Sequence, residues 1–578
     1  MVNSHRTCKE NEETQAIQLI KKNTKYFFSY AKRFSKLKNN IGPLIDKNEK
    51  VVSDDQGMAQ MLATQFSNAY SQPKSKLPTA SELFDNCSSF MNSLPFTEED
   101  LLEAIESLKL QSSAGPDGFP SVYLKICRYS LVKPLYLLWM QSLLDGTVPK
   151  AFKNTTITPL FKKGSAGNPD NYRPIASSSH LIKIFEKVVR KYLLSYLEEN
   201  NLLNPSQHGF RCNRSCLSQL LSHYETILRL IEEGLGTDVI YLDFSKAFDK
   251  VDFSILLSKL KKLGIGGCVA KWIYSFLTDR TQRVVVNGVF SHSILVLSGV
   301  IQGSVLGPLL FMIMVGDIDQ DVFTSVLSSF ADDTRVMHGI SDVSDCSSLQ
   351  SDIDAIYSWA NENNMQFNDL KFEVMRYNTL PKTNNVVYAD SNKCNILEKT
   401  TVKDLGVLMS NTARFSDHID TIYSSIKNMS SWILRTFMSR NRLPMITLWK
   451  SLVVPIHDYC SQLWSPLKTG DIQKLDLLQW YFIKKVNNMY SFDYWECLSE
   501  LNLLSLQRRR ERYQIIYLWK IIENIVPSPT VYIHGISQKC IGIRISPRNG
   551  RSCIPPVIKR QCSVKFQNTR LSSFCIHA

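Results

Sequence analysis

Two adjacent carboxylates interrupt an otherwise apolar pair of predicted strands. In "SSFADDTRVM" (328–337), Asp332 and Asp333 lie between a stretch rich in Val, Phe and Thr (321–330) and a second short stretch (334–340). Two short strands with so tight a connection predict a β-hairpin. Like charges a few ångströms apart repel each other and shift each other's pKa. We therefore expect another part of the fold to stabilise the two charges at this hairpin tip.

A second acidic strand supplies a partner, in "DVIYLDFSKAFDKVDFSILLSKLKKLG" (238–264). A buried strand is predicted to end at Asp243, and an amphipathic helix follows, with Asp252 as its N-cap and Gly264 at its end. If this strand lies beside the hairpin in one sheet, three carboxylates meet. Such a cluster holds two divalent cations about 3.5–4 Å apart, as in phosphoryl transfer, and their charge offsets the repulsion. A single aspartate would be interpreted as a turn or cap residue, but two such sites on separate apolar strands favour a catalytic centre.

The net charge of +14 is concentrated at the two ends of the chain. Residues 501–578 contain 13 Lys and Arg against 2 Asp and Glu, and residues 1–50 contain 11 against 5. Basic ends around a near-neutral middle favour a phosphate-rich partner held at the periphery; the alternative is solvated surface. The polar N-terminus has no secretory signal, and cysteines without regular spacing fit reduced thiols inside a cell.

One long apolar segment could be mistaken for a membrane span. Residues 294–315 are interrupted by Gln302, two serines and Pro308, and they lack basic flanks. We expect a strand, a glycine loop and a buried helix that begins near Pro308, and no membrane partner.

Several motifs, taken together and in order, resemble one family. "YLDFSKAFDKV", "SGVIQGSVLGPLLF" and "FADDT" are similar to the reverse transcriptases of non-LTR (LINE-type) retrotransposons, and most similar to the jockey and chicken-repeat group. "AGPDGFP", "NYRPIA", "QHGFR" and "DLGVLM" also occur in family order. The resemblance covers about 115–410, with a weaker continuation to 513. It implies an α+β, right-hand polymerase fold with fingers, a palm built on an antiparallel sheet, and a helical thumb.

The resemblance also divides the chain into regions. We expect a basic helical or linker region over 1–110, fingers and palm over 111–410, a helical thumb or connection over 411–515, and a basic C-terminal tail over 516–578. Nothing before residue 115 resembles the endonuclease domain with which family members normally begin. The end of the chain resembles the start of a family tail motif that normally continues, so we expect a truncated tail.

The implied activity is that of an RNA-directed DNA polymerase, which adds dNMPs to a primer 3′-OH on an RNA template. Asp243, Asp332 and Asp333 would bind two Mg²⁺ ions, or Mn²⁺ in their place, with the Phe244 backbone carbonyl as a further ligand. The implied partners are an RNA template, a DNA primer and dNTPs, in the cytoplasm or the nucleus; the oligomeric state stays open. The alternatives are a catalytically inactive, nucleic-acid-binding remnant and an RNA-dependent RNA polymerase.

The resemblance assigns nucleotide contacts to three further residues. Phe248 matches the bulky residue that screens the sugar 2′ position and so favours deoxynucleotides; the alternative is a core phenylalanine. Gln302 and Gly303 match a glycine-rich turn beside the incoming nucleotide, where a missing side chain lets the backbone approach the substrate.

Five cations complete the predicted site. Arg173, together with Lys162, resembles the fingers residues that hold the triphosphate, and a guanidinium fork suits phosphate oxygens; a surface arginine is the alternative. Lys371 falls where the family has a lysine near the leaving pyrophosphate, and it is a candidate general acid, the alternative being an exposed strand lysine. Arg211 and Arg214 are candidates for nucleic-acid contact.

A last candidate surface lies near the basic end. Apolar residues recur at helical spacing in 506–522 and predict a face that docks on the thumb: Ile515, Leu518, Trp519 and Ile522. Arg508, Arg509 and Arg512 cannot all lie on that face, so we expect some of them to contact a phosphate backbone. The alternative is a solvated helix surface.

Overall fold

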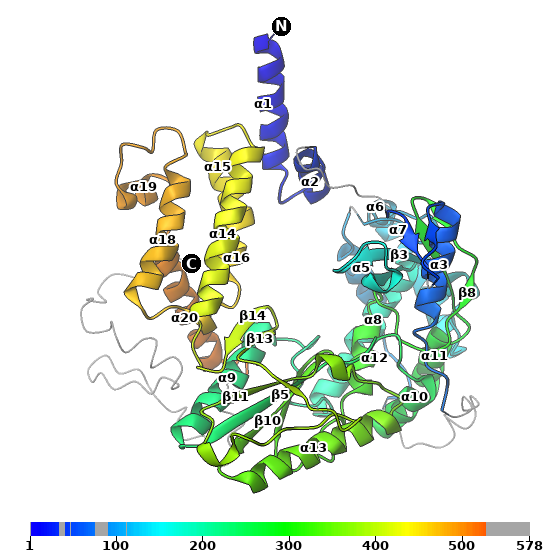
Figure 1. The fold of residues 1–578 in the computed structure, drawn as a ribbon. Helices are drawn as coiled ribbons and strands as arrows, with labels where there is room; N and C mark the ends of the chain where they lie inside the picture. Colours follow the sequence, from blue (N-terminus) through cyan, green and yellow to red (C-terminus); the bar gives the residue numbers. More distant parts are fainter. Residues whose placement is uncertain (1, 34–40, 47, 75–90, 111, 528–578) are drawn as a thin grey trace.

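The computed structural model describes residues 2–33, 41–46, 48–74, 91–110 and 112–527. Helices and sheets are mixed, which confirms the expected α+β class. The two five-stranded sheets are called here the central sheet and the outer sheet, and residues 416–522 form a helical region. In Figure 1 the helical region and the outer sheet rise on opposite sides of the central sheet.

The central sheet contains the strands that carry the acidic residues. Its order is β12 (Leu397–Glu398), β11 (Glu373–Tyr377), β5 (Gly236–Leu242), β10 (Asp333–Ile340) and β9 (Val326–Phe330). β9 and β10 form the predicted hairpin, joined by Ala331 and Asp332, although β9 begins five residues later than expected. β5 pairs antiparallel with β10, with Leu242 opposite Thr334. The strand that ends at Asp243 therefore lies beside the hairpin, as predicted.

Both faces of the central sheet are covered. Ile240 and Leu242 of β5 enter one hydrophobic core, whereas Val239 enters a second core on the other face. The first core includes α8 (His180–Glu199), α10 (Phe253–Lys262), α12 (Gly307–Met314) and α13 (Val343–Glu362). The second includes α9 (Cys216–Glu232) and the helical region. Burial on both faces explains why β5 is apolar without alternation.

The elements that follow β5 form as predicted. The Asp252 carboxylate caps α10 by accepting hydrogen bonds from the backbone N–H groups of Ser254 (2.9 Å) and Ile255 (3.4 Å), and Gly264, with φ 78°, follows the helix end. Residues 294–315 form β8 (Ile294–Leu295), a loop and α12. Among the described residues, no helix is both long and apolar enough to cross a membrane.

The outer sheet is built from β4 (Tyr172–Ser177), β3 (Asn154–Phe161), β6 (Thr281–Val286) and β7 (Val289–Phe290), with β8 paired to β6. Met58, Leu62 and Phe66 of α3 (Asp55–Ser67) form a small core with this sheet, and Figure 1 shows α3 alongside it. Four further helices contribute buried residues to the first hydrophobic core: α5 (Glu98–Glu106), α6 (Ser121–Ile126), α7 (Arg128–Leu144) and α11 (Gly267–Leu277). Part of the expected N-terminal linker thus belongs structurally to the outer sheet.

The helical region follows the hairpin of β13 (Thr401–Asp404) and β14 (Val407–Ser410). Its helices are α14 (Ser416–Thr436), α15 (Arg442–Leu448), α16 (Val454–Asp458), α17 (Ser461–Trp464), α18 (Thr469–Ile483), α19 (Tyr494–Glu500) and α20 (Leu506–Ile522). The N-terminal helices α1 (Val2–Gln18) and α2 (Thr24–Lys32) pack on this region, where Phe27 stacks on Phe437 with ring centroids 5.7 Å apart. The described helices α1 and α2 thus pack on the helical region, whereas α3 packs on the outer sheet.

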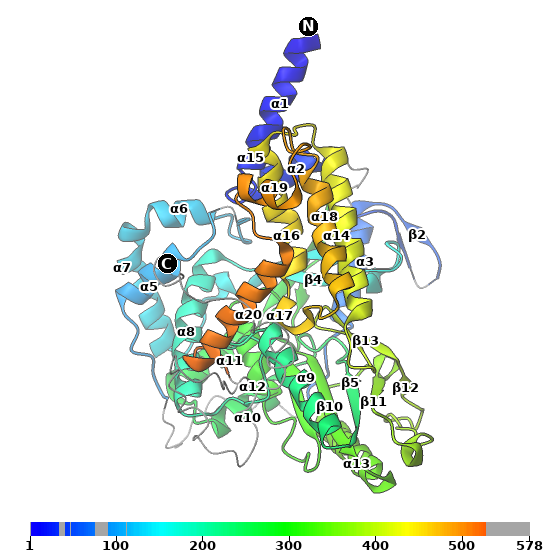
Figure 2. The same cartoon turned by 90° about the vertical axis from the view of Figure 1, so that its left-hand side faces the viewer.

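The predicted orientation of α20 is wrong. Ile515, Trp519 and Ile522 are each more than half exposed, while Leu506, Arg510 and Tyr517 are buried. Arg510 can be buried because its guanidinium donates a hydrogen bond to His457 Nε2 (2.7 Å). α20 also runs through the expected boundary at 515, and the tail from residue 528 onward lies outside the described residues. Figures 1 and 2 place α20 on the side of the helical region away from the outer sheet.

Candidate active site

Three carboxylates meet at one edge of the central sheet. Asp243 directly follows β5, and Asp333 is the first residue of β10. Because Leu242 pairs with Thr334, the next residues outward, Asp243 and Asp333, lie across from each other on neighbouring strands. Asp332 lies in the two-residue turn before β10. The structure thus brings together the three carboxylates that the sequence selected.

The three negative charges disfavour one another. Burial raises the pKa of Asp332, and the charge of Asp243 raises it further. The surrounding protein atoms, which exclude water, raise the pKa of Asp333, as do the charges of Asp332 and Asp243. Each shift favours the protonated carboxyl group, so a cation at this edge would stabilise the ionised forms.

Lys371 supplies one such positive charge. Its ammonium group forms an ion pair with the Asp243 carboxylate. Lys371 lies in a 3₁₀ turn, Asp369–Lys371, just before β11, rather than on a strand. The backbone N–H of Asn368 also donates a hydrogen bond to the Asp243 carbonyl (2.8 Å), so this segment fixes both the backbone and the side chain of Asp243.

Carboxylate oxygens are the ligands that hard divalent ions prefer, so the donor chemistry of this edge fits such an ion. In the part of the chain that the structure describes, however, no three Asp, Glu, His or Cys side chains converge into a metal-binding group. Asp243 is directed toward Lys371 instead. To bind a metal ion here, the Asp243 carboxylate would have to give up its ion pair with Lys371 and contact the metal ion instead.

Two cations of the outer sheet act on the same carboxylates. Arg173 lies on β4, and Lys162 directly follows β3 in the connection between these paired strands. The charges of both residues oppose the increase in the pKa of Asp332. Burial, followed by the charges of Arg173 and Lys371, lowers the pKa of Lys162. The outer sheet therefore presents positive charge to the acidic edge.

The Phe248 ring lies between two other aromatic rings. It stacks on Phe311 of α12 with centroids 4.5 Å apart, and Phe210 meets it edge-on at 6.3 Å. The ring is half-buried. The stacking on Phe311 is a contact expected of a core phenylalanine, while part of the Phe248 surface remains accessible to a substrate.

Gly303 lies against the backbone of β4 in the outer sheet. A Cβ atom at Gly303, whose φ is 118°, would lie only 2.5 Å from the Ala176 carbonyl oxygen of β4. The backbone carbonyl of Gln302 accepts a hydrogen bond from the Ala176 N–H (2.8 Å). The side-chain amide of Gln302 donates a hydrogen bond to Asp249 Oδ1 (2.9 Å). Close approach of the protein's own backbone is by itself enough to require glycine here, and the predicted contact with a nucleotide stays a prediction.

Arg211 and Arg214 contact the protein itself. Arg211 is largely buried, where its Nη2 pairs with Glu198 Oε2 (2.6 Å) and its Nη1 donates to the Asn204 carbonyl (2.9 Å). Arg214 donates to the backbone carbonyls of Pro205 and Gln207. The predicted nucleic-acid contact of Arg211 is therefore not supported, because its guanidinium stabilises the loop instead.

The three arginines of α20 differ from one another. Arg509 pairs with Asp458, with 2.5 Å between Nη2 and Oδ2, so a phosphate contact by Arg509 is not supported. Arg508 and Arg512 are exposed, and the Arg508 guanidinium lies over the Trp495 ring at 6.0 Å from its centroid. Neither arginine belongs to the acidic edge, since α20 lies on the far side of the helical region.

A buried ion pair that no sequence motif indicates lies behind the carboxylates. Arg335 of β10 and Asp404 of β13 are almost completely buried, with 2.7 Å between Nη1 and Oδ2. Burial raises the pKa of Asp404 to about 6, and the Arg335 charge opposes this increase. The pair connects the central sheet to the hairpin that leads into α14. No spacing signal relates positions 335 and 404, so only the fold reveals the pair.

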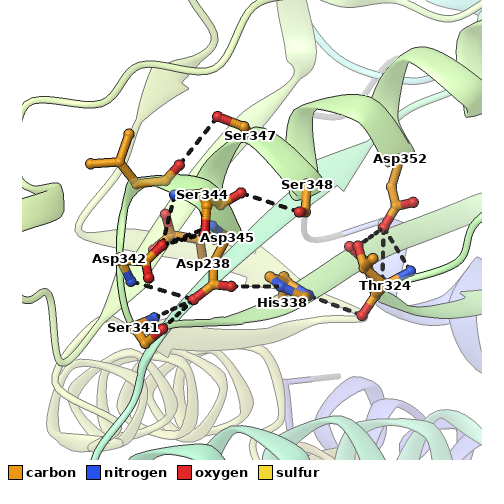
Figure 3. Close-up of polar contacts among 12 residues, drawn as sticks. Asp238, Thr324, His338, Ser341, Asp342, Ser344, Asp345, Ser347, Ser348 and Asp352 are labelled. Carbon is orange, nitrogen blue, oxygen red and sulfur yellow. Dashed lines mark hydrogen bonds and ion pairs between the residues drawn. The ribbon is translucent and has the colours of Figure 1, made fainter.

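The opposite end of the β9–β10 hairpin is anchored by a polar network (Figure 3). His338 of β10 lies between Asp345, whose Oδ1 is 4.0 Å from Nε2, and the Thr324 carbonyl, which is 3.0 Å from Nδ1. Asp352 of α13 accepts hydrogen bonds from the backbone N–H groups of Thr324 (3.3 Å) and Ser325 (2.8 Å). The base of the hairpin is thus fixed to α13.

Comparison with known proteins identifies the family. Residues 161–409 match the family model described as reverse transcriptase (RNA-dependent DNA polymerase). This segment contains all three carboxylates. Residues 161–409 therefore form a reverse transcriptase domain, and the chain is similar to RNA-directed DNA polymerases of non-LTR retrotransposons. The resemblance stated from the sequence motifs is confirmed, and the family in general depends on divalent metal ions and acts on nucleic acids.

Three relatives illustrate the similarity. The RNA-directed DNA polymerase from the mobile element jockey of Drosophila melanogaster is 27% identical over 415 residues, which are 69% of this chain and 45% of the relative. The probable RNA-directed DNA polymerase from transposon BS of the same species is 26% identical over 399 residues, or 67% and 44%. The Pol polyprotein of the type-1 element R2 of Popillia japonica is 31% identical over 227 residues, or 39% and 30%. The chain spans less than half the length of these relatives.

In the metal-free protein, Asp332→Asn should increase thermal stability near neutral pH. The folded-state pKa of Asp332 is raised, so stability is present at low pH and is lost as pH rises through that pKa. The amide keeps the shape and removes the charge. We expect the variant to melt above the wild type in EDTA at about pH 7 and the difference to shrink below about pH 4. Asp354→Asn, an exposed carboxylate of α13, is the control; an Asp332→Asn variant that melts at or below the wild-type temperature at about pH 7 contradicts this assignment.

Proposed function

We propose that this chain is an RNA-directed DNA polymerase that adds dNMPs to the 3′-OH of a primer annealed to an RNA template. The observation that supports it most strongly is the pairing of β5 with β10, which aligns Asp243 with Asp332 and Asp333 inside a reverse transcriptase domain. The names of the jockey and BS relatives describe the same activity for those proteins. RNA template, DNA primer and dNTPs are the proposed partners, inside the cell in cytoplasm or nucleus.

The three parts of the fold fit the parts of a right-hand polymerase. We assign the central sheet to the palm, the outer sheet with α3 and α5–α7 to the fingers, and the helical region α14–α20 to the thumb. The arrangement in Figure 1, with two parts rising on opposite sides of the central sheet, supports this assignment. The Arg335–Asp404 ion pair then joins the palm to the hairpin at the base of the thumb.

Asp243, Asp332 and Asp333, with the Phe244 carbonyl, would hold two divalent ions, Mg²⁺ or Mn²⁺. Such ions, when bound, lower the pKa of the attacking hydroxyl and stabilise charge on the leaving oxygen. In the reaction the primer 3′-hydroxyl gives up its proton to solvent water and its oxygen forms a bond to the α-phosphorus. The bond between that phosphorus and the bridging oxygen breaks, and pyrophosphate leaves. We assign to Lys371, once it is released from Asp243, the role of the general acid that donates a proton to the pyrophosphate.

The outer-sheet cations supply the nucleotide contacts. Arg173 and Lys162 face the acidic edge, so their positive charges suit the triphosphate oxygens of a dNTP. Gln302 and Gly303 hold the neighbouring loop against β4 through the Ala176 backbone, which keeps these cations in a fixed position relative to the sheet. We assign Arg508 and Arg512 to a peripheral contact with RNA, because they are exposed and lie far from the carboxylates.

Asp332→Asn and Asp243→Asn should each abolish primer extension while RNA binding changes less than twofold. Loss of one carboxylate removes several kcal/mol of charge stabilisation, so we expect the rate to fall by about 100-fold or more. The assay extends oligo(dT) on poly(A) with dTTP and Mg²⁺, and Asp354→Asn serves as the matched control. Extension by either variant at a rate near that of the wild type excludes the carboxylates from the reaction; an inactive wild type that binds RNA favours the non-catalytic remnant.

Phe248→Val should reduce discrimination between dNTPs and NTPs. A smaller side chain makes room for a 2′-hydroxyl, and we expect the ratio of kcat/KM for dTTP to that for UTP to fall about tenfold, equivalent to about 1.4 kcal/mol. Phe311→Leu removes the stacking partner from the core without opening the sugar position, and it should lower stability while keeping the ratio. An unchanged ratio for Phe248→Val returns this ring to a purely structural role, and preference for UTP in the wild type favours an RNA polymerase.

A further inference from the structure

The turn that carries Asp332 is held by a segment far away in the sequence. Residues 206–208 run alongside β9: the Ser329 N–H donates to the Ser206 carbonyl (3.1 Å), and the His208 N–H donates to the Ser329 carbonyl (2.9 Å). Gln207 and Ser329 form a parallel bridge. This segment, which contains the start of "QHGFR", acts as an additional short strand at the edge of the central sheet.

The Gln207 side chain forms hydrogen bonds with the backbone of the turn. Its Oε1 accepts hydrogen bonds from the N–H of Ala331 (2.8 Å) and of Gly209 (2.7 Å), and its Nε2 donates to the Ala331 carbonyl (3.2 Å). Gln207 is only 5% exposed. Both backbone polar groups of Ala331, the residue directly before Asp332, are therefore bound by one buried amide.

The turn needs such support because its backbone is strained. Ala331 has φ 57°, in the left-handed region that residues with a Cβ atom rarely adopt. Asp332 and Asp333 follow immediately, so a relaxed Ala331 would redirect both carboxylates. Hydrogen bonds at both the N–H and the carbonyl of one residue fix the orientation of the two peptide planes around it.

Gly209 allows this arrangement. A Cβ atom at Gly209 would lie 2.4 Å from the Ala331 nitrogen and 3.0 Å from its Cα, so only glycine lets the two backbones approach so closely. Arg214 donates to the Gln207 carbonyl (3.3 Å), and His208 Nδ1 lies 2.9 Å from Ser218 Oγ. The segment 206–208, which holds the turn, is thus itself bound to the surrounding loop and to α9.

We propose that Gln207 is a positioning residue: it holds Ala331 in its strained conformation and thereby directs Asp332 and Asp333 toward Asp243. This inference rests on the proposed polymerase function for its kinetic consequence. Its structural consequence, the alignment of three carboxylates for a divalent ion, is measurable without catalysis. Gln207 contacts neither the reacting atoms nor the ion in this account.

The test compares Gln207→Met, which removes all three hydrogen bonds at similar volume, with Gln479→Met. Gln479 is an equally buried glutamine that accepts a hydrogen bond from Tyr494 (2.8 Å) and donates to the Leu504 carbonyl (3.1 Å), far from the carboxylates. Mn²⁺ binding to the full chain is measured by electron paramagnetic resonance, with Asp332→Asn defining the background. Primer extension at varied Mn²⁺ gives kcat and the half-saturating ion concentration.

We expect Gln207→Met to weaken Mn²⁺ binding and raise the half-saturating concentration at least tenfold, with a lower kcat and RNA binding within twofold. Gln479→Met should lower the melting temperature and keep both Mn²⁺ values. Wild-type Mn²⁺ affinity in a folded Gln207→Met overturns the inference. If the wild type fails to extend primers, the polymerase proposal fails, and the Mn²⁺ comparison still decides the role of Gln207.

Gln207→Glu keeps the test decisive if Gln207→Met does not fold. A glutamate retains acceptors for the Ala331 and Gly209 N–H groups, and it replaces the donor to the Ala331 carbonyl by a carboxylate oxygen that repels this carbonyl. We expect a folded protein with Mn²⁺ affinity reduced at least threefold. Gly209→Ala should give the same direction of change, because its Cβ displaces Ala331. Unchanged Mn²⁺ affinity in both variants also overturns the inference.

Discussion

The antiparallel pairing of β5 with β10 is the constraint on which the site depends. A shift by one residue would turn every side chain of a strand to the opposite face. Because alternate residues of β5 enter different cores, with Ile240 on one side and Val239 on the other, such a shift would exchange the contents of both cores. The register that keeps Leu242 opposite Thr334 also aligns Asp243, which follows Leu242, with Asp333, which precedes Thr334.

That alignment brings three negative charges close together, and positive charges on neighbouring elements partly offset their repulsion. Asp243 pairs with Lys371 from the segment before β11, and the outer sheet adds the charges of Arg173 and Lys162. Burial, followed by the neighbouring negative charges, nevertheless keeps the pKa values of Asp332 and Asp333 raised, so their ionised forms remain disfavoured in the protein without a cation. In this account the site is arranged for a state in which positively charged ligands are present, which is consistent with the divalent-metal dependence of the family.

Local sequence signals predicted the elements whose stabilisation is local. The cap of α10 at Asp252, the hairpin around Ala331 and the apolar strand β5 each depend on residues within a few positions. Predictions failed where a distant partner decides burial. Arg510 donates a hydrogen bond to His457 and is buried, so the buried face of α20 is not the one that its apolar spacing indicated.

The same distinction applies to the site. The three aspartates were found because each ends or begins an apolar strand and the family motifs agree with them. The supporting contacts were not found, since nothing in the spacing relates Arg335 to Asp404 or assigns Gln207 to the Ala331 turn. Arg211 has the positive charge that a contact with nucleic acid requires, but its guanidinium forms an ion pair with Glu198 of the same protein. Charge alone did not distinguish a phosphate ligand from an internal ion pair.

Affinity cleavage with Fe²⁺ tests the central claim, that carboxylates from β5 and from the β9–β10 turn form one cation site. Fe²⁺ replaces Mg²⁺, and ascorbate with peroxide generates hydroxyl radicals that cut the backbone beside the bound ion. The account predicts two clusters of cuts, one around residue 243 and one around residues 331–333, both competed by Mg²⁺ and both lost in Asp332→Asn. Cuts near only one of these segments, or both clusters at wild-type intensity in Asp332→Asn, would contradict it.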